Sequence, residues 1–533
     1  MSPSLVVAVL GDVGSVAVAE TTAAFGPDVD AGRCRVVTVE GVSSARSALA
    51  DSSFVTFICG GERPASDAIA LITSVLDARP DIDLLYGDEV LDAGVLNADA
   101  VGGDPVPFHK PAWSPERLLS HNYVGSMATY RSTFVAGADV ADATGLAVEQ
   151  QLHDLALQAA SNASVVAHLP RILCNRRATL TDDSVLVVQR HFDRQGWPAK
   201  ATMTSRTWAG RRLGGFEPAL GEARPLVSIV IPTGGSSRTV RGETFVLVDN
   251  AITSLIERST YAAIEIVVVV DAKSTTALAE RLRGLDERVR IVKDTRPFNF
   301  AAACNLGVQS SNGSIVVLLN DDTEVVTENW VERLIVLTSP DNVGAVGVKL
   351  FYSDGRVQHG GVATRDTGPD HLYHGYPGDD VGHGGWLQSM VNCFAATGAC
   401  LAVRRDHWDA VGGMDEQFPL NYNDIDLCLR LHAEGWRTVV DNQTELMHLE
   451  TSSRPAGSKT WEVDAFRERW GTWLNSDPYD NPNLVTVGLQ QVPPPAVLTT
   501  LAEHRGRIQH PARIWSRSEG FGLAVNEQRV GDQ

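Results

Sequence analysis

Two carboxylates follow a short apolar stretch in the second half of the chain. Residues 315–319 read IVVLL, and Asn320, Asp321 and Asp322 come directly after them. Such an apolar stretch is typical of a buried strand, and ligands of open α/β sheets bind beyond the carboxyl ends of strands. Carboxylate oxygens there can hold Mg²⁺ or Mn²⁺, and the ion can in turn hold a diphosphate. An Asp-rich turn after a strand gives the same pattern, so the segment alone leaves both interpretations open.

Two more polar side chains stand at the ends of predicted elements. Asp424 opens a predicted helix that ends near Gly435, and His448 follows a strand-like stretch. A carboxylate at a helix start that faces a cleft can act as a general base, although helix capping is the more frequent use of Asp there. A lone His is more often structural, but with a distant Asp pair it would complete an octahedral metal site.

These side chains need a fold that gathers strand ends at one edge. Apolar stretches alternate with helix-like segments in the second half, which predicts an α/β sheet with crossover helices. The predicted strands are 226–232, 264–270, 289–292, 315–319 and 343–350, and the clearest predicted helices are 245–259 and 276–284.

The two halves of the chain resemble one another. The blocks FVTFI, GSMATYR and HDLAL of the first half correspond to IVVLL, GACLAVR and IDLCL of the second. The paired blocks lie 261 to 273 residues apart, and a near-constant offset predicts a duplicated domain. The alternative is that any two α/β domains share apolar strands.

The duplication suggests four regions. The first copy spans 1–205, and 206–225 is a Gly-, Arg- and Pro-rich linker. The second copy spans 226–476, and 477–533 is an irregular extension. The first copy is about 40 residues shorter between its first strand and its FVTFI strand, where an α/β fold of this order would hold a nucleotide.

Composition excludes several classes of protein. The chain has 533 residues, 44% hydrophobic and 21% charged, which is ordinary for a folded protein of several domains. A net charge of -20 argues against a nucleic-acid partner and disfavours adhesion to anionic lipid. The seven cysteines lack CxxC spacing, and the sequence has no recognisable signal peptide and no apolar run long enough to span a membrane. These features favour a cytoplasmic protein. A peripheral position at the inner face of the cell membrane stays open.

The second half resembles family 2 glycosyltransferases with the GT-A fold. Six blocks occur in the order seen in that family, across about 225–473. They are LVSIVIPT, VVVVDAKS, FNFAAACNLGV, LLNDDTEV, TGACLAVRR and NDIDLCLRL. The resemblance is closest to bacterial members that build cell-wall or surface polysaccharides, including rhamnosyl- and galactosyltransferases. It implies a duplicated GT-A fold with a shortened first copy.

The resemblance implies a pocket for a nucleotide-diphosphate sugar. Pro232, Thr233 and Asp271 match the positions that cradle the nucleobase and ribose. Asn305 lies in a block that lines the same pocket.

The resemblance also implies the chemistry. Asn320, Asp321 and Asp322 match the DxD motif, with Asn in place of the first Asp. The match implies that Asn320 and Asp321 bind the donor and that Asp322 is the main metal ligand. Asp424 matches the catalytic base, and His448 matches a metal-binding histidine, so the implied cofactor is Mg²⁺ or Mn²⁺. The QxxRW motif of processive, membrane-embedded synthases is missing from the sequence.

The first half looks like a decayed copy of the same domain. Residues 59–62 (CGGE) replace the DxD motif, and the positions of Asp424 and His448 fall on Leu152 and Cys174. We therefore expect the first copy to be non-catalytic.

The expected function is inverting, metal-dependent transfer of a sugar to a hydroxyl of a glycan or lipid-linked glycan in cell-wall or surface polysaccharide synthesis. One displacement with one base inverts the anomeric centre, although the sequence does not exclude a retaining route. A nucleotidylyltransferase would need a Gly- and Arg-rich loop, which PTGGSSR at 232–238 resembles only weakly. A dehydrogenase would need a GxGxxG motif, which the sequence lacks. A non-catalytic protein that binds sugar nucleotides or glycans is the other alternative.

Overall fold

The computed structural model describes most of the chain. The described residues are 4–91, 106–139, 145–176, 184–208, 210–222, 224–240, 242–365, 368–449, 460–474, 477–487, 490–492 and 511–517. Within them, no helix combines the length and the apolar character that crossing a membrane requires.

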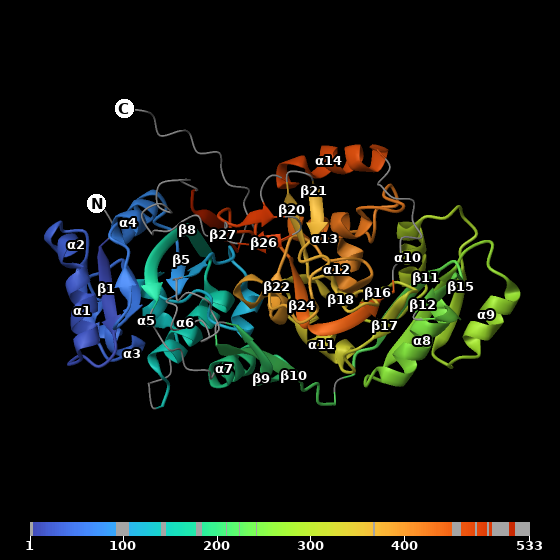
Figure 1. Ribbon diagram of the computed structural model, residues 1–533, viewed down its shortest axis with the longest axis horizontal. Coiled ribbons are helices and arrows are strands. Elements are labelled where there is room, and N and C mark those ends of the chain that lie inside the picture. The colour runs from blue at the N-terminus through green and yellow to red at the C-terminus, as the bar shows by residue number, and fades with distance from the viewer. Residues whose placement is uncertain are drawn as a thin grey trace.

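Two mixed sheets form the centres of the two halves (Figure 1). The first runs in the order β2-β1-β3-β7-β5-β8-β27, and the second in the order β15-β14-β11-β16-β23-β18-β24-β17. The strands of the first sheet are β1 (Leu5–Leu10), β2 (Arg35–Val39), β3 (Phe54–Cys59), β5 (Leu84–Leu91), β7 (Ala128–Arg131), β8 (Val165–Arg176) and β27 (Arg513–Ser516). Those of the second are β11 (Val227–Thr233), β14 (Ile264–Val270), β15 (Val289–Lys293), β16 (Ile315–Leu319), β17 (Thr323–Val325), β18 (Val343–Phe351), β23 (Cys400–Arg404) and β24 (Arg437–His448).

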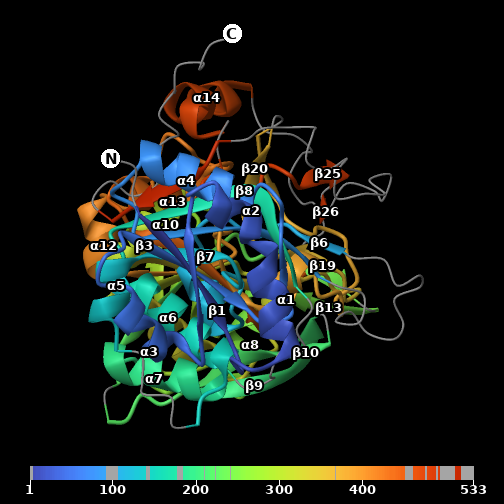
Figure 2. The same ribbon diagram turned by 90° about the vertical axis from the view of Figure 1, so that its left-hand side faces the viewer.

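Helices flank both sheets. In the first half they are α1 (Val16–Ala24), α2 (Gly26–Asp30), α3 (Val42–Ala45), α4 (Ala68–Ala78), α5 (Ser132–Gly137), α6 (Val148–Asn162) and α7 (Val185–Gln195). In the second they are α8 (Leu247–Arg258), α9 (Thr276–Arg283), α10 (Phe300–Gln309), α11 (Trp330–Thr338), α12 (Arg405–Ala410), α13 (Asn423–Ala433) and α14 (Thr460–Leu474). The predicted helices at 245–259 and 276–284 correspond to α8 and α9. Figure 2 shows α14 standing above the body of the protein.

The strand order confirms the predicted duplication. In each half a parallel pair, β1 with β3 or β11 with β16, is followed by two antiparallel pairings and then by a parallel pair, β5 with β8 or β18 with β24. The second sheet has β15 beyond β14, whereas the first sheet ends at β2. The first copy is therefore shortened at the edge where the sequence loses its residues, and the predicted α/β class is confirmed.

The segment predicted as a linker contains regular structure. Residues 206–208 end strand β9 (Ala199–Trp208), and β10 (Arg211–Pro218) pairs with it as an antiparallel hairpin. Phe216 of β10 is buried under Arg333 of α11, whose guanidinium lies 4.2 Å from the ring centroid and donates to the Phe216 carbonyl over 2.6 Å. The Gly and Arg content suggested an open connector, but apolar side chains of β10 pack against the second half.

The predicted irregular extension is partly ordered as well. Strand β27 pairs antiparallel with β8, and the Asn481 side-chain amide donates to Asp88 of the first half over 2.9 Å. A small hairpin of β25 (Val485–Val487) and β26 (Gln490–Val492) lies between these contacts in the sequence. The rest of the extension lies outside the described residues.

Buried polar contacts join the two halves directly. The guanidinium of Arg437 lies 2.6 Å from a carboxylate oxygen of Glu116, and both side chains are buried. The Ser114 hydroxyl donates to the Asn392 side-chain oxygen over 3.0 Å. Removing one partner of such a buried pair is costly, so these contacts fix how the halves meet.

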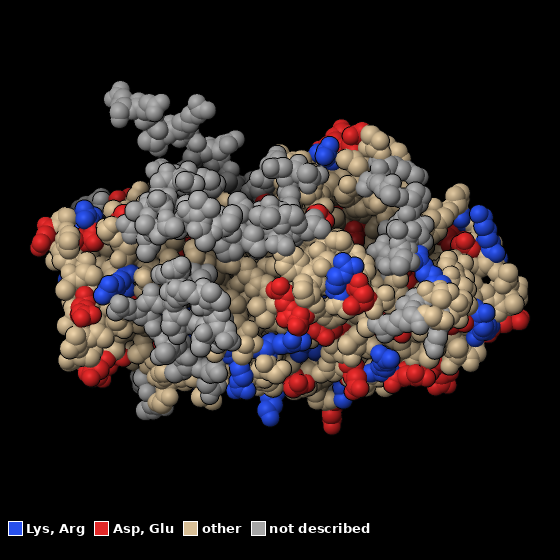
Figure 3. Space-filling view, in the orientation of Figure 1, with Lys and Arg blue, Asp and Glu red and all other residues tan. Residues whose placement is uncertain are grey.

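On the face shown in Figure 3, acidic and basic side chains are interspersed.

Candidate active site

Three parallel strands bring the predicted site residues to one edge of the second sheet. Strand β11 lies between β14 and β16, and all three run in the same direction. Their carboxyl ends are marked by Asp271 after β14, Thr233 at the end of β11 and Asn320 after β16, in that order along the sheet. This edge is where α/β sheets bind ligands, as the sequence predicted.

Asp321 links two of these strand ends. The Thr233 hydroxyl donates to Asp321 Oδ2 over 2.6 Å, and the Gly235 N–H donates to the same hydroxyl over 2.9 Å. Burial, with the neighbouring Asp322 carboxylate, raises the pKa of Asp321 to about 6. Asp321 therefore fixes the loop after β11 to the loop after β16.

Asp322 and His448 face one another. Strand β17 pairs with β24 so that Thr323 lies opposite His448, which brings Asp322 Oδ1 to 2.9 Å from His448 Nε2. Burial alone would raise the pKa of Asp322, but the adjacent imidazole holds it below its ordinary value. Asp322 and His448 are 126 residues apart in the sequence, and the pairing of β17 with β24 brings them together.

The orientation of the His448 ring is set by Gln358. The His448 Nδ1–H donates to Gln358 Oε1 over 2.7 Å, and Gln358 is buried. The other ring nitrogen, Nε2, lies 3.1 Å from the Asn320 amide nitrogen and 2.9 Å from Asp322 Oδ1. A bound cation would take the place of a proton on Nε2, and the ring nitrogen and the Asp322 carboxylate would then be two of its ligands.

These residues fit a divalent metal ion. Asn320 Oδ1 is buried and has no hydrogen-bond partner among the described residues, so a third oxygen is at hand. No group of three or more His, Cys, Asp or Glu side chains in the described part of the chain is placed to hold a metal. The pair of Asp322 and His448 would therefore need oxygens from a bound diphosphate, which is how Mg²⁺ is often held.

Gln358 was missed by sequence reasoning, and it yields a test. Gln358→Leu removes the acceptor that orients His448, and we expect metal-dependent binding of nucleoside diphosphates to weaken by about 10–100-fold. Gln358→Glu keeps an acceptor oxygen and should bind almost as well as the wild type. Calorimetric titration of UDP, GDP and dTDP with Mn²⁺ measures this. Equal affinity of the Leu variant and the wild type would show that Gln358 does not orient the ring.

Asp424 lies in the first turn of α13. Its Oδ2 accepts from the Gly398 N–H over 2.8 Å, and its Oδ1 accepts from the Ile425 N–H over 2.9 Å. The capping position is taken by Tyr422, whose φ of +63° is rare for a residue with a side chain. Asp424 is therefore not the N-cap residue, although its carboxylate accepts from one backbone N–H of the first turn.

A short stretch of backbone connects Asp424 with the DxD-like motif. Gly398 donates to Asp424, and the next residue, Ala399, accepts a hydrogen bond from the Asn320 N–H over 3.0 Å. A Cβ on Gly398 would lie 3.3 Å from the Cβ of Asp424, so a larger residue there would press on the carboxylate. The structure thus holds the predicted base beside the predicted metal ligands.

Helix α14 supports the turn before Asp424. Buried Glu462 accepts from the backbone N–H groups of Leu420 and Asn421, both over 3.1 Å. The Tyr422 ring stacks on Phe466 with centroids 4.6 Å apart. These contacts hold the unusual backbone of Tyr422 and so fix where α13 begins.

A hollow beside β11 and β14 contains three of the four residues predicted to line the pocket for the nucleobase and ribose. Pro232, Thr233 and Asp271 line it together with Arg296 and Phe298. Phe298 is 63% exposed, which is unusual for a large apolar side chain and gives a flat surface beside the strand ends. Sequence reasoning quoted the block that contains Phe298 but assigned it no role, although an aromatic residue between Pro297 and Asn299 was a usable signal of a loop position.

Two predicted donor residues make contacts within the protein. Asp271 Oδ1 accepts from the Ser274 hydroxyl over 2.8 Å, which shapes the turn after β14. Asn305 lies on α10 and exchanges hydrogen bonds of 2.9 Å with the Met414 backbone in both directions. The structure thus places Asn305 against the 414–416 loop, apart from the residues that line the hollow.

The corresponding place in the first half is filled by the protein's own charges. Glu62 follows β3 as Asp322 follows β16, and it is buried 3.6 Å from the Arg176 guanidinium. Arg176 and Lys110 also lie 3.0 and 3.1 Å from Glu89. Two buried cations here neutralise two buried carboxylates, so the residues that would meet a metal ion are already paired.

Loss of an acidic side chain should therefore have different effects in the two halves. In the first half it should lower stability and leave turnover unchanged. Glu62→Ala leaves Arg176 with one partner and should lower the free energy of unfolding by about 3 kcal/mol, while turnover per folded molecule stays unchanged. Glu62→Gln keeps hydrogen-bonding capacity and should be milder. Urea unfolding curves beside a steady-state assay compare the two properties. Loss of turnover in well-folded Glu62→Ala would show that the first half takes part in the chemistry.

The chain is similar to known proteins over parts of its length. Residues 228–407 match the model of glycosyl transferase family 2, a range that includes Asp322 and ends before Asp424 and His448. The chain is 32% identical over 451 residues to an uncharacterised protein, y4gI, of Sinorhizobium fredii, covering 78% of this chain and 47% of that protein. It is 31% identical over 479 residues to the O-antigen biosynthesis protein RfbC of Myxococcus xanthus, covering 84% and 34%.

The chain spans between about a third and a half of the length of these two curated relatives. A solved mannosyltransferase from Pyrobaculum calidifontis, in complex with GDP-Man and Mn²⁺, is 16% identical and covers 48% of this chain and 66% of that chain, with a TM-score of 0.33. The ordered blocks of the second half and the match of residues 228–407 lead to one conclusion. Residues 228–407 of the chain form a glycosyl transferase family 2 domain.

Proposed function

We propose that the protein transfers a sugar from a nucleotide-diphosphate sugar to a hydroxyl of a glycan or lipid-linked glycan in the synthesis of a cell-wall or surface polysaccharide. The observation that carries the proposal is the pair of Asp322 and His448 at the strand ends of a glycosyl transferase family 2 domain. The likeness to a protein named for O-antigen biosynthesis supports the polysaccharide role. A lipid-linked acceptor would place the protein at the inner, cytoplasmic face of the cell membrane.

The donor binds across the carboxyl ends of β11, β14 and β16. Phe298 offers an exposed aromatic face to a nucleobase, beside Pro232 and Asp271. Asp322, His448 and Asn320 would hold Mg²⁺ or Mn²⁺ at the diphosphate. The bound ion supplies positive charge that stabilises the departing diphosphate.

Asp424 acts as the general base. Its carboxylate takes the proton of the acceptor hydroxyl, whose oxygen then bonds to the anomeric carbon as the bond from that carbon to the diphosphate oxygen breaks. The N–H groups of Gly398 and Ile425 hold the carboxylate in place through one hydrogen bond to each oxygen. A single displacement with a single base inverts the anomeric configuration.

The chemistry is confined to the second half. Glu62 and Glu89 of the first half are buried and paired with Arg176 and Lys110. We assign that half a supporting role, through the buried contacts that join it to the second half.

A thermal-shift screen of nucleotide sugars tests the donor class. With Mn²⁺ present, the true donor should raise the melting temperature progressively as its concentration rises, because it binds only the folded protein. UDP-, GDP- and dTDP-linked sugars are compared with the free sugars as controls. A protein that responds to none of these donors, while remaining folded, would contradict the proposal.

A further inference from the structure

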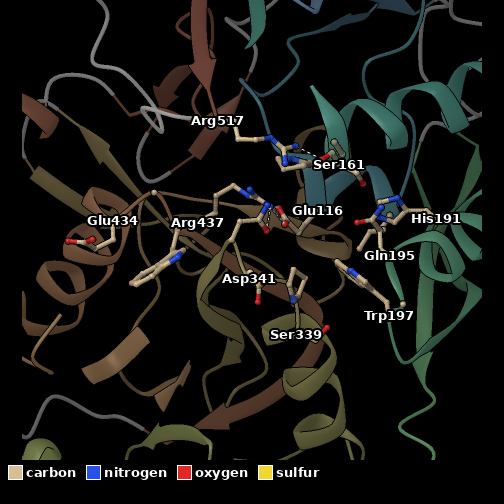
Figure 4. A pocket seen from close by; sticks show the side chains of 18 of the residues that line it. Glu116, Ser161, His191, Gln195, Trp197, Ser339, Asp341, Glu434, Arg437 and Arg517 are labelled. Carbon is tan, nitrogen blue, oxygen red and sulfur yellow. Dashed lines mark hydrogen bonds and ion pairs between the residues drawn. The ribbon is translucent and has the colours of Figure 1, made fainter. Parts of the chain in front are cut away.

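A second cleft lies between the two halves, far from the strand ends described above (Figure 4). It has a volume of about 690 Å³, well within the range of sites that hold small molecules. Arg437, at the start of β24, lines this cleft, and His448 ends the same strand. A strand rises about 3.3 Å per residue, and the register of β24 with β18 shows bulges that shorten it, so the cleft and the metal-binding pair are on the order of 30 Å apart.

Two tryptophans supply flat surfaces in this cleft. Trp197 of the first half stacks on Phe192, with ring centroids 5.5 Å apart. Trp436 of the second half stacks on His407, with ring centroids 3.9 Å apart. Each indole is only half-buried, because one face packs on the neighbouring ring. Rigid, half-covered indoles bind flat ligand faces at a small entropic cost.

Four helices end at the cleft. They are α6, α7, α11 and α13, whose last turns or following residues line it. The carboxyl end of a helix presents unpaired carbonyl oxygens and partial negative charge. Glu434 and Asp341 add carboxylates at the rim, while Arg517 of the lining already donates to carbonyl groups at the end of α6. Hydroxyl groups that donate hydrogen bonds suit these surroundings, and anionic groups do not.

The cleft also has buried polar groups in its wall. Glu116 and Arg437 form an ion pair of 2.6 Å there. His191 is 6% exposed, and its Nδ1 has no hydrogen-bond partner among the described residues. Burial lowers the pKa of His191 to about 4, so the ring is neutral near pH 7. Figure 4 shows His191 and Trp197 on the side of the first half, across from Arg437 and Asp341.

We propose that this cleft is a saccharide-binding site that holds an uncharged segment of the glycan acceptor, away from the place where the sugar is transferred. Stacking on Trp197 and Trp436 and hydrogen bonds from sugar hydroxyls to helix-end carbonyls provide the recognition. The identity of the ligand as part of the acceptor rests on the proposed function, whereas the cleft itself does not. The first half then contributes half of a glycan site although its own strand ends are filled.

An array of neutral and uronic-acid-containing bacterial oligosaccharides, probed with the full chain, tests the proposal. We expect neutral oligosaccharides to be retained, and excess inorganic phosphate not to displace them. For a retained glycan, Trp197→Ala should weaken binding by about tenfold or more in calorimetry, because truncating a central indole removes much of its contact. Gln195→Trp is a second variant, which changes an exposed lining residue and blocks the cleft without removing a buried contact.

Matched controls separate this site from the active site. Trp461→Ala, at an exposed tryptophan of α14 outside the cleft, should bind the glycan as the wild type does. Asp322→Ala should also retain glycan binding, and Trp197→Ala should retain binding of nucleoside diphosphates with Mn²⁺. Glycan binding in a protein that binds no nucleotide donor would support the cleft and contradict the proposed function. Retention of acidic glycans alone, of no glycan, or of neutral glycans equally by Trp197→Ala and Gln195→Trp would overturn the proposal.

Discussion

Asp424→Asn is expected to lower turnover by about 10²–10⁴-fold while donor affinity stays nearly unchanged. The substitution keeps the size of the side chain and removes its ability to accept a proton. One oxygen remains to accept from either Gly398 or Ile425, so the fold should lose no more than about 1 kcal/mol of stability. Steady-state release of nucleoside diphosphate, beside calorimetric binding of the donor, measures both properties.

A matched control distinguishes the loss of the general base from the loss of a negative charge. Asp464→Asn removes a carboxylate from an exposed position on α14 and should turn over as the wild type does. Normal turnover of Asp424→Asn would place the base elsewhere. A parallel fall in donor affinity would show that Asp424 contributes to donor binding as well.

Asp322→Ala is expected to abolish metal-dependent donor binding and turnover together. Asp322 is the carboxylate that faces His448 Nε2, so its removal leaves His448 and the Asn320 amide oxygen as the ligands from the protein. The expected weakening exceeds about 100-fold, because a direct ligand matters more than a residue that only orients one. Calorimetry of UDP, GDP and dTDP with and without Mn²⁺ is the measurement.

His448→Ala should weaken the same property less, since Asp322 remains. Asp354→Asn, at an exposed carboxylate of the second half, is the control for a general change of charge and should bind as the wild type does. Unchanged Mn²⁺ dependence in Asp322→Ala would refute the assignment of this metal site.

Local sequence was enough to predict the elements that carry the site. Apolar stretches that end in Asp or Thr indicated β11, β14 and β16, because a strand buried on both faces has few polar residues until it ends. The duplication was also visible, since strands in the same order repeat their hydrophobic pattern at a fixed offset. The α/β class and the existence of these strands are therefore confirmed, whereas the roles of Asp424, Asp322 and His448 stay predictions.

Contacts between distant residues could not be predicted in the same way. Gln358 is 90 residues from His448 and meets it only because the chain folds back beside the strand that ends there. Residues 206–225, which contain the end of β9 and all of β10, were interpreted as a linker because of their Gly, Arg and Pro content. Asn305 was assigned to the donor pocket from its block alone, but its amide reaches the Met414 backbone.

Metal-dependent turnover of a sugar nucleotide is the most direct test of the account. The rate of nucleoside diphosphate release is measured for the donor that raises the melting temperature most, first with Mn²⁺, then after EDTA, and again after Mn²⁺ is restored. We predict release with Mn²⁺, its loss with EDTA and its recovery when the ion returns, with Asp322→Ala inactive throughout. Release that EDTA leaves unchanged, or that Asp322→Ala retains, would contradict the account.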